Sequence, residues 1–302
     1  MDKPDFLIIG AAKSGTTSLY FYLQQHPWIF MPFNKEPFFF AFENQDMTRY
    51  RFDGNIKALK NAIVDLDDYQ ALFSSVPERI KCGEASTLYL YMPEAAGRIA
   101  HHLPSAKLIA VLRNPIDRAY SHFQHFRREG YEPIGEFSMA IRAESQRIEE
   151  NWFPSYFYLD AGFYSRQIKR FYEFFPKSQL KIFLFEDLKD ARKMVGEIFK
   201  FLDLEAIIPS DTTSRHNISG TVRYPDFYRR VKDSSRIKPF LRRLIPPSMW
   251  SRVKARWEQM VIDPAQPMSQ EDRASLIEVY RQEIADLEKL LDRDLSAWLK
   301  RN

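Results

Sequence analysis

The sequence predicts a three-layer α/β/α fold, in which helices cover both faces of a central parallel sheet. Short apolar runs alternate with amphipathic stretches over roughly the first two-thirds of the chain, as in proteins built from strand–helix–strand units. The apolar runs are continuous, which is typical of strands buried on both faces. A glycine-containing loop joins the first run to a helical stretch, FLIIGAAKSGTTSLYFYL, residues 6–23.

Each element is expected from its own local pattern. The clearest strands are Phe6–Ile9, Lys107–Leu112 and Leu180–Phe185. Helices are expected to follow Gly15, Asp68, Pro93, Pro115 and Phe163, and to include Arg192–Leu202. A proline just after a strand is a good helix start, because its missing N–H group would have no partner in the first turn.

The C-terminal part is expected to be a helical extension of the same domain. From Ser269 to Leu291 apolar residues recur at helical spacing, and Ser269 with Asp272 resembles a capping pair. No linker or repeat marks a boundary earlier in the chain. We therefore expect residues 1–302 to form a single domain, closed by a helix over about residues 269–299.

Length and composition indicate a globular protein. The chain has 302 residues, of which 45% are hydrophobic and 15% aromatic, enough for a sizeable core. The first apolar run, Phe6–Ile9, is too short to span a bilayer, so we expect neither a signal peptide nor a membrane anchor. Cys82 is the only cysteine, which excludes an intramolecular disulfide and is consistent with a reducing compartment. The expected location is the cytoplasm.

Positive charge is concentrated in one segment. The net charge of the chain is only +4, yet residues 215–256 hold twelve Lys or Arg against two Asp. This segment reads as a basic helical region, interrupted at residues 246–247 by two prolines. It is either a solvated surface or a contact for an anionic ligand, an acidic acceptor or a membrane surface. A peripheral membrane contact would involve residues 236–257, where two tryptophans lie among the basic residues.

The loop after the first strand has the form of a phosphate cradle. Gly10 and Gly15 stand five positions apart between a buried strand and a helix, as in the nucleotide-binding loop G-x-x-x-x-G-K-[ST]. Backbone N–H groups at the start of the helix would face an anion, assisted by the helix dipole. The hydroxyl groups that add donors are those of Ser14, Thr16, Thr17 and Ser18. The alternative is a tight turn with no ligand.

The lysine of this loop is displaced. Thr16 stands where an NTPase requires lysine, and the lysine is Lys13, inside the loop. The buried strand at 108–112 ends in Arg113 rather than in the aspartate that would hold Mg²⁺, so we expect no metal. A transferring sulfuryl group carries less charge than a phosphoryl group. One lysine and a set of neutral donors could therefore stabilise its transfer.

Two motifs resemble those of sulfotransferases that use 3′-phosphoadenosine 5′-phosphosulfate (PAPS). GAAKSGTTSLYFYLQQHP, residues 10–27, resembles the loop that binds the 5′-phosphosulfate. VLRNPIDRAYSHFQHFRREG, residues 111–130, resembles the strand and helix that bind the 3′-phosphate, with Arg113 and Ser121 at the matching positions. An arginine at a strand end and a serine two turns along the next helix can converge on one phosphate.

The resemblance extends over most of the chain and implies the sulfotransferase fold. Residues 161–188 are similar to the family's core helix and strand, and LEKLLDRDLSAWL to its closing helix. NKEPFFF, residues 34–40, resembles a segment of the heparan-sulfate and related glycan branch that supplies a glutamate beside the acceptor, which implies this role for Glu36. Phe38 departs from relatives that have histidine there, which affects acceptor contacts rather than donor binding.

The resemblance implies in-line transfer of the sulfuryl group to a hydroxyl or amine, with release of adenosine 3′,5′-bisphosphate (PAP). Lys13 would neutralise charge on the leaving oxygen, and Glu36 would be the general base. Glu84, after a probable strand, is the main alternative base, and His122 is a weaker candidate. A glutamate in a short turn is also often only a solvated charge, and a helix histidine is often only packed.

Further residues are assigned by position. Arg113 and Ser121 are expected to bind the donor, unless Arg113 pairs with Asp117; Arg118 is expected to be structural. RHNISGTVRYP, residues 215–225, occupies the place of a basic donor-binding loop, from which the candidates are Ser219, Gly220 and Arg223. The aromatic residues that line either an acceptor cleft or the core are Trp28, Trp152, Phe153 and Tyr156.

The acceptor is not determined by the sequence: a glycan, another small molecule or a lipid head group would each suit the basic segment. We expect a bacterial enzyme acting on a cytoplasmic intermediate. The alternatives are a small-molecule kinase, which must explain Thr16, and a non-catalytic nucleotide-binding protein, against which the intact Lys13 and Glu36 argue. No nucleic-acid-binding module is present, so a nucleic-acid partner is not expected.

Overall fold

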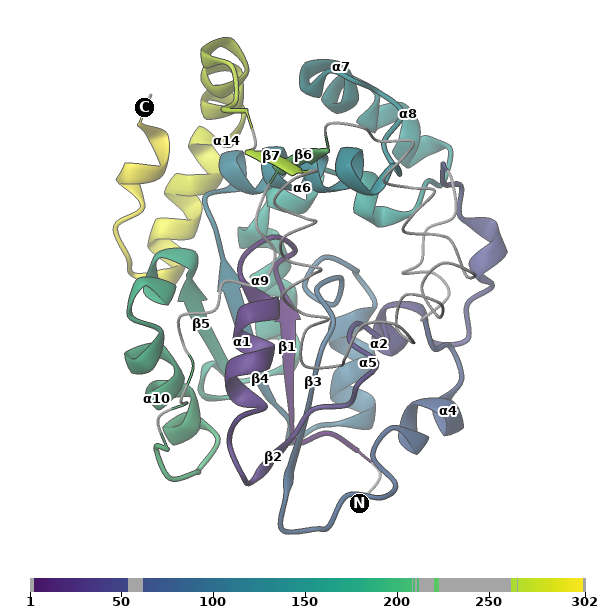
Figure 1. The fold of residues 1–302 in the computed structure, drawn as a ribbon, viewed down its shortest axis with the longest axis vertical. Coiled ribbons are helices and arrows are strands. Elements are labelled where there is room, and N and C mark those ends of the chain that lie inside the picture. The colour runs from purple at the N-terminus through teal and green to yellow at the C-terminus, as the bar shows by residue number, and fades with distance from the viewer. Residues whose placement is uncertain are drawn as a thin grey trace, which may run out of the picture.

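A parallel sheet forms the centre of the molecule. The computed structural model describes residues 3–53, 62–207, 209, 211, 220–222, 262–264 and 266–300. Within them, five parallel strands are arranged in the order β2–β3–β1–β4–β5 (Figure 1). The strands are β1 (Phe6–Gly10), β2 (Ile29–Phe30), β3 (Lys81–Ala85), β4 (Lys107–Leu112) and β5 (Leu180–Leu184). The predicted α/β class with a central parallel sheet is confirmed.

The alternation of side chains along the strands divides the core into two clusters. Phe6 and Ile8 of β1 belong to one cluster, and Leu7 and Ile9 belong to the other. All four side chains are completely buried. Successive side chains of a strand point to opposite faces, so a continuous apolar run requires a helical layer on each face.

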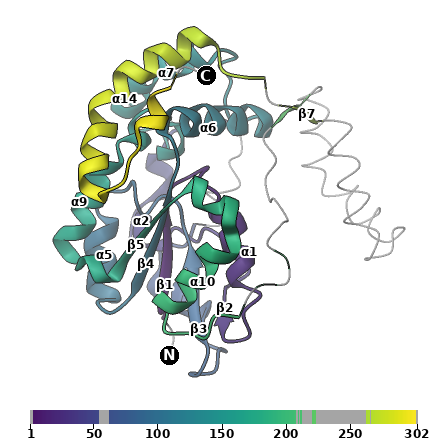
Figure 2. The same cartoon turned by 90° about the vertical axis from the view of Figure 1, so that its left-hand side faces the viewer.

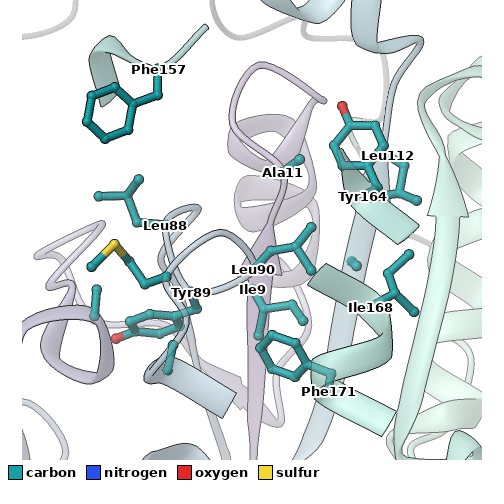
Figure 3. Packing of buried hydrophobic residues seen from close by; sticks show 14 of the residues in the cluster. Ile9, Ala11, Leu88, Tyr89, Leu90, Leu112, Phe157, Tyr164, Ile168 and Phe171 are labelled. Atoms are coloured by element: carbon teal, nitrogen blue, oxygen red, sulfur yellow. The ribbon is translucent and has the colours of Figure 1, made fainter. Parts of the chain in front are cut away.

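Helices supply these two layers (Figure 2). One face is covered by α1 (Thr16–Leu23) and α10 (Ala191–Phe201), and the other by α5 (Ala95–His102) and α9 (Tyr164–Phe174). Helix α6 (Pro115–Glu129) follows β4, and α14 (Gln270–Leu291) packs on α6 and α9. In Figure 3, Ile9 and Leu112 of the sheet lie with Ile168 and Phe171 of α9 in one apolar cluster.

Short helices and one antiparallel pair of strands complete the described chain. The remaining α-helices are α2 (Phe39–Phe42), α4 (Leu66–Ala71), α7 (Phe137–Arg142) and α8 (Glu144–Glu149). The 3₁₀ helices are η1 (Met47–Arg49), η2 (Pro154–Tyr156), η3 (Asp160–Gly162), η4 (Lys177–Gln179), η5 (Phe185–Asp190) and η6 (Ser296–Leu299). Strands β6 (Gly220–Val222) and β7 (Ile262–Pro264) pair antiparallel, and β6 contacts α6.

Most predicted boundaries agree with the structure to within a residue or two. Pro115 begins α6, and the hydroxyl of Ser269 accepts a hydrogen bond from the backbone N–H of Asp272, as predicted. The prediction of a helix after Asp68 was wrong: α4 begins earlier, because the Asp65 side chain caps its first turn. The closing helix ends at Leu291 and is followed by η6.

Some predictions fall outside the described residues. Most of the basic segment 215–256, and all of 236–257, lie there. In the part of the chain that the structure describes, no helix is both long and apolar enough to span a membrane.

Candidate active site

The loop after β1 passes through two residues with left-handed backbone conformation. These are Lys13, with φ of 64°, and Gly15, with φ of 87°. A Cβ atom on Gly15 would lie 2.3 Å from Cδ1 of Leu188, so only glycine fits where the loop turns into α1. A left-handed conformation costs an ordinary residue such as lysine about 1–2 kcal/mol. Strain of this kind concentrates at functional sites, which directs attention to Lys13.

Two buried hydroxyl groups lack aligned hydrogen-bond partners among the described residues. They are Oγ of Ser14, in the loop beside the hydroxyl of Tyr164, and Oγ of Ser121, on α6. Helix α1, whose first turn contains Thr16, Thr17 and Ser18, has no side-chain cap at its N-terminus. Buried polar groups are nearly always paired. Unpaired hydroxyls beside an uncapped helix start indicate that a polar ligand completes the site.

Arg113 extends from the end of β4 toward the loop. Its Nη1 donates a hydrogen bond to the backbone oxygen of Lys13 at 3.1 Å, and its guanidinium lies 4.7 Å from the ring centroid of Phe185. Burial lowers the pKa of Arg113. Asp117 forms its ion pair with Arg273, not with Arg113. Asp117 therefore does not occupy the guanidinium of Arg113 in an ion pair.

Lys13 and Glu36 interact although they lie 23 positions apart in the sequence. The pKa of Lys13 is lowered to about 7, mainly by burial and then by the charges of Arg128 and Arg113, while Glu36 acts in the opposite direction and Lys35 has a smaller lowering effect. The loop lysine thus lies in a cluster of positive charge with a single nearby carboxylate. Such a cluster suits an anionic ligand and weakens the proton affinity of the lysine.

Glu36 is held in a fixed orientation. Its backbone N–H donates to the carbonyl oxygen of Ala85 at 3.1 Å. Its Oε1 accepts hydrogen bonds from Oγ1 of Thr87 at 3.0 Å and from Nζ of Lys35 at 3.2 Å. The side chain is 29% exposed, so the carboxylate is both positioned and accessible. These are the geometric requirements of a general base.

Glu84, the alternative base, lies in the interior at the end of β3. Its side chain has no exposed surface. Its carboxylate accepts hydrogen bonds from the hydroxyls of Tyr69, at 3.4 Å, and Ser86, at 3.0 Å. Burial raises the pKa of Glu84 to about 7. A glutamate in this position contacts the protein on all sides.

His122 is also buried. Its ring packs edge-on against Phe126 and Tyr158, with centroids 4.9 and 5.4 Å away. Burial, and then the charges of Arg118 and Lys13, hold its pKa well below the usual range, and its Nδ1 has no aligned partner among the described residues. The ring is therefore neutral near pH 7.

The other predicted residues have diverse surroundings. Arg118 is buried and donates to the backbone oxygen of Tyr158, in agreement with a structural role. Phe153 and Tyr156 belong to the core, whereas Trp28 is 41% exposed. The partly buried Trp152 packs against that core. Of the predicted donor loop, Ser219 and Arg223 lie outside the described residues, and Gly220 begins β6.

Sequence reasoning missed Arg128 and the hydroxyls of Ser86 and Thr87. Arg128 is seven positions after Ser121 and so lies on the same face of α6, a spacing that could have identified it. The two hydroxyls gave no such signal, because their segment meets the turn that carries Glu36 only when β2, which precedes the turn, pairs with β3. Among the described residues, no group of His, Cys, Asp and Glu is arranged to hold a metal ion.

Comparisons with known proteins agree with this geometry. Residues 4–208 match the model of the sulfotransferase family. The structure superimposes on a sulfotransferase from Alicyclobacillus acidocaldarius with a TM-score of 0.75 and 30% identity, covering 99% of both chains. Human bifunctional heparan sulfate N-deacetylase/N-sulfotransferase 3 is 28% identical over 98% of this chain and 31% of its own length.

A second curated relative matches a shorter part of the chain. The membrane-associated sulfotransferase kil1 of Dictyostelium discoideum is 32% identical over 48% of this chain and 29% of its own length. The chain thus spans about a third of the length of the curated relatives that it matches. Since the family model covers more than half of the chain and the bacterial structure covers nearly all of it, the protein belongs to the sulfotransferase family, a family of transferase enzymes.

Proposed function

We propose that this protein transfers a sulfuryl group from PAPS to a hydroxyl or amine group of an acceptor. One observation carries the proposal: Arg113 donates to the backbone of the loop that carries Lys13, and the charges of Arg113, Arg128 and Glu36 act on that lysine. Among the described residues, the buried hydroxyls of Ser14 and Ser121 have no aligned partner. A donor with a 5′-phosphosulfate and a 3′-phosphate brings two anionic groups. These groups would satisfy both the unpaired hydroxyls and the clustered positive charge.

The residues divide the work of binding and transfer. Ser14 and the first turn of α1 hold the phosphosulfate through hydroxyl and backbone N–H groups, while Arg113 and Ser121 hold the 3′-phosphate. Lys13 stabilises negative charge on the oxygen that leaves the sulfur atom. Its lowered pKa favours a lysine that gains a proton when the anionic donor arrives.

Glu36 accepts the proton of the acceptor. Hydrogen bonds from Thr87 and Lys35 fix its carboxylate, and its exposure leaves room for an acceptor group. No metal is part of the proposal, because Arg113 stands at the end of β4 where an NTPase places a Mg²⁺-binding aspartate. Lys13 neutralises the charge that a Mg²⁺ ion neutralises in an NTPase.

We propose a carbohydrate as the acceptor. Relatives that match over nearly the whole chain are named heparan sulfate N-sulfotransferases, and the segment NKEPFFF resembles the acceptor-side segment of that branch. A lipid head group or another small molecule is the alternative acceptor. A cytoplasmic location is proposed with it, and cell fractionation tests this location directly.

A thermal-shift titration tests donor binding without knowledge of the acceptor. A ligand at a hundred times its dissociation constant adds about 2.7 kcal/mol to the free energy of unfolding. We expect stabilisation by PAP and little or none by ADP or by ATP with Mg²⁺. Stabilisation by ATP with Mg²⁺ alone would instead assign the loop to a kinase. A PAP-stabilised protein that consumes no PAPS with any carbohydrate, lipid or phenol acceptor would indicate a non-catalytic nucleotide-binding protein.

A further inference from the structure

Glu84 differs from the other buried glutamates of the described chain in its surroundings. Glu132 forms a bidentate ion pair with Arg147, and Glu144 accepts two backbone N–H groups. Glu84 has only hydroxyl groups as hydrogen-bond partners, and no lysine, arginine or histidine of the described chain forms an ion pair with it. Its burial is costly, since a buried carboxylate without a cation loses most of its hydration.

The contacts of Glu84 lead to the turn that carries Glu36. Oε2 of Glu84 accepts the hydroxyl hydrogen of Ser86 at 3.0 Å. Oγ of Ser86 in turn accepts a hydrogen bond from the backbone N–H of Phe38 at 3.1 Å. Phe38 is two residues after Glu36. A chain of two hydrogen bonds therefore connects the buried carboxylate to the turn.

This turn needs external support. Both Glu36 and Phe38 have left-handed backbone conformations, with φ of 63° and 57°. This conformation is unfavourable for residues with a Cβ atom and persists only where the surroundings impose it. Three of the supporting contacts come from one short segment at the end of β3, residues 85–87, through the carbonyl oxygen of Ala85 and the hydroxyls of Ser86 and Thr87. The backbone N–H of Ile63 also donates to the carbonyl oxygen of Pro37 at 2.8 Å.

Ser86 can support the turn only if its hydroxyl points away from it. A serine hydroxyl rotates freely and both donates and accepts. When its hydrogen is directed to Glu84, a lone pair of the oxygen is left to accept the N–H group of Phe38. The hydroxyls of Tyr69 and Tyr89 are buried beside the same carboxylate, and that of Tyr89 has no aligned hydrogen bond. The two side chains keep water away from the carboxylate.

We propose that Glu84 is a positioning residue that acts through Ser86 on the turn at 36–38 and so sets the orientation of the Glu36 carboxylate. The inference rests on the sulfuryl-transfer function proposed above. Glu84 itself does not meet the acceptor, because its side chain has no exposed surface. Its role differs from that of a base in one chemical respect: positioning requires only an oxygen that accepts a hydrogen bond, whereas a base requires a carboxylate.

Glutamine at position 84 separates these roles. Glu84→Gln keeps an acceptor oxygen for Ser86 and removes the ability to take a proton, whereas Glu84→Leu removes both. Ser86→Ala breaks the connection and leaves the carboxylate present, with the hydroxyl of Tyr69 as its remaining donor. A matched control is Glu283→Leu. Glu283 is also buried and bonds a serine, accepting the N–H and hydroxyl groups of Ser165 at 2.7 Å, but it lies on α14.

Hydrogen–deuterium exchange of the peptide 34–40 measures the support of the turn directly. We expect Glu84→Leu and Ser86→Ala to speed its exchange at least about tenfold, and Glu84→Gln to change it less than about threefold. Turnover of PAPS with a glucosamine-containing oligosaccharide is expected to fall about tenfold to a hundredfold in the first two variants. Their affinity for PAP should stay within about twofold of wild type. Glu283→Leu should alter neither the exchange of 34–40 nor turnover.

Three outcomes overturn the proposal. Loss of turnover in Glu84→Gln with normal exchange of 34–40 would make Glu84 the base. Unchanged exchange and turnover in Ser86→Ala would show that the connection does not support the turn. If Glu283→Leu changed the exchange of 34–40 and the turnover as much as Glu84→Leu does, the effect of Glu84 would be a general loss of stability rather than support of the turn. If the wild-type protein neither binds PAP nor consumes PAPS, the proposed function fails by itself, while the exchange of 34–40 still decides whether Glu84 supports the turn.

Discussion

The donor side and the acceptor side of the site differ in how their polar groups are satisfied. On the donor side, the hydroxyls of Ser14 and Ser121 are buried without aligned partners among the described residues, and positive charges crowd around Lys13. On the acceptor side, Glu36 already has hydrogen bonds to its backbone and its carboxylate. Under the proposed function, an anionic donor would complete the first of these sides, whereas the hydrogen bonds of Glu36 organise the second in advance. We expect substitutions on the two sides to separate binding from turnover.

The largest effect is expected for Glu36→Gln. Removal of a general base lowers turnover about 100-fold or more, because such proton transfer contributes roughly 10² to 10⁴ in rate. PAP affinity should remain unchanged, since Glu36 belongs to the acceptor side. Steady-state turnover and PAP titration of the variant measure both. A variant with normal turnover would remove Glu36 from the reaction.

Lys13→Ala is expected to slow sulfuryl transfer by at least ~100-fold, equivalent to about 2.7 kcal/mol of barrier. The fold should persist, because alanine keeps the Cβ atom and leaves the backbone conformation at this position unchanged. Lys200→Ala, which removes an exposed lysine of α10, is the control and should have a much smaller effect. Near-normal turnover in Lys13→Ala would contradict its role.

Arg113→Gln is expected to weaken PAP binding about 10-fold to 100-fold, because a hydrogen bond to a charged group contributes roughly 1.5–3 kcal/mol. Turnover at saturating PAPS should change far less. Ser121→Ala should have the same pattern with a smaller loss. Isothermal titration with PAP and saturation kinetics distinguish the two quantities, and a loss confined to turnover would place Arg113 outside the donor site.

The smallest expected effect is a proton linkage at Lys13. Its pKa is about 7 in the folded protein against 10.5 for an ordinary lysine, so the unfolded chain binds more protons between these values. The cost of burying charged Lys13 is therefore full below pH 7 and is relieved as pH rises toward 10. PAP favours the charged lysine, so its affinity should fall by up to about tenfold per pH unit above 7.

Calorimetry in two buffers of different ionisation enthalpy measures the protons taken up on binding PAP. Wild-type protein should take up a proton near pH 8, and Lys13→Met should not. Equal proton uptake in both proteins would assign the linkage to another group.

Local sequence patterns were sufficient for the sheet and for the donor loop. Buried strands such as Phe6–Gly10 form continuous apolar runs, and the helix start at Pro115 depends on residues next to each other in the chain. These features follow from short-range sterics and hydrogen bonding, which a single sequence records. The boundary at Asp68 was wrong because the Asp65 cap competes with it, and sequence spacing alone does not rank two such caps.

The acceptor side could not be predicted in the same way. Glu36 and Glu84 were both candidate bases. Only the pairing of β3 with its two neighbours, β1 and β2, buries Glu84 in the sheet and leaves Glu36 partly exposed in the turn after β2. Arg128 was not identified because its effect on Lys13 depends on how α6 lies over the loop.

The chain's amino-acid order was therefore enough to establish its α/β class and to identify the displaced lysine of the loop, and it predicts Arg113 and Ser121 as donor-binding residues, because each feature depends on residues close together in the sequence. Tertiary structure alone decided which glutamate is exposed, which hydroxyls lack aligned partners among the described residues, and how far the pKa of Lys13 is lowered. Burial and the meeting of distant charges are properties of the folded chain, since they arise only when segments far apart in sequence exclude water together.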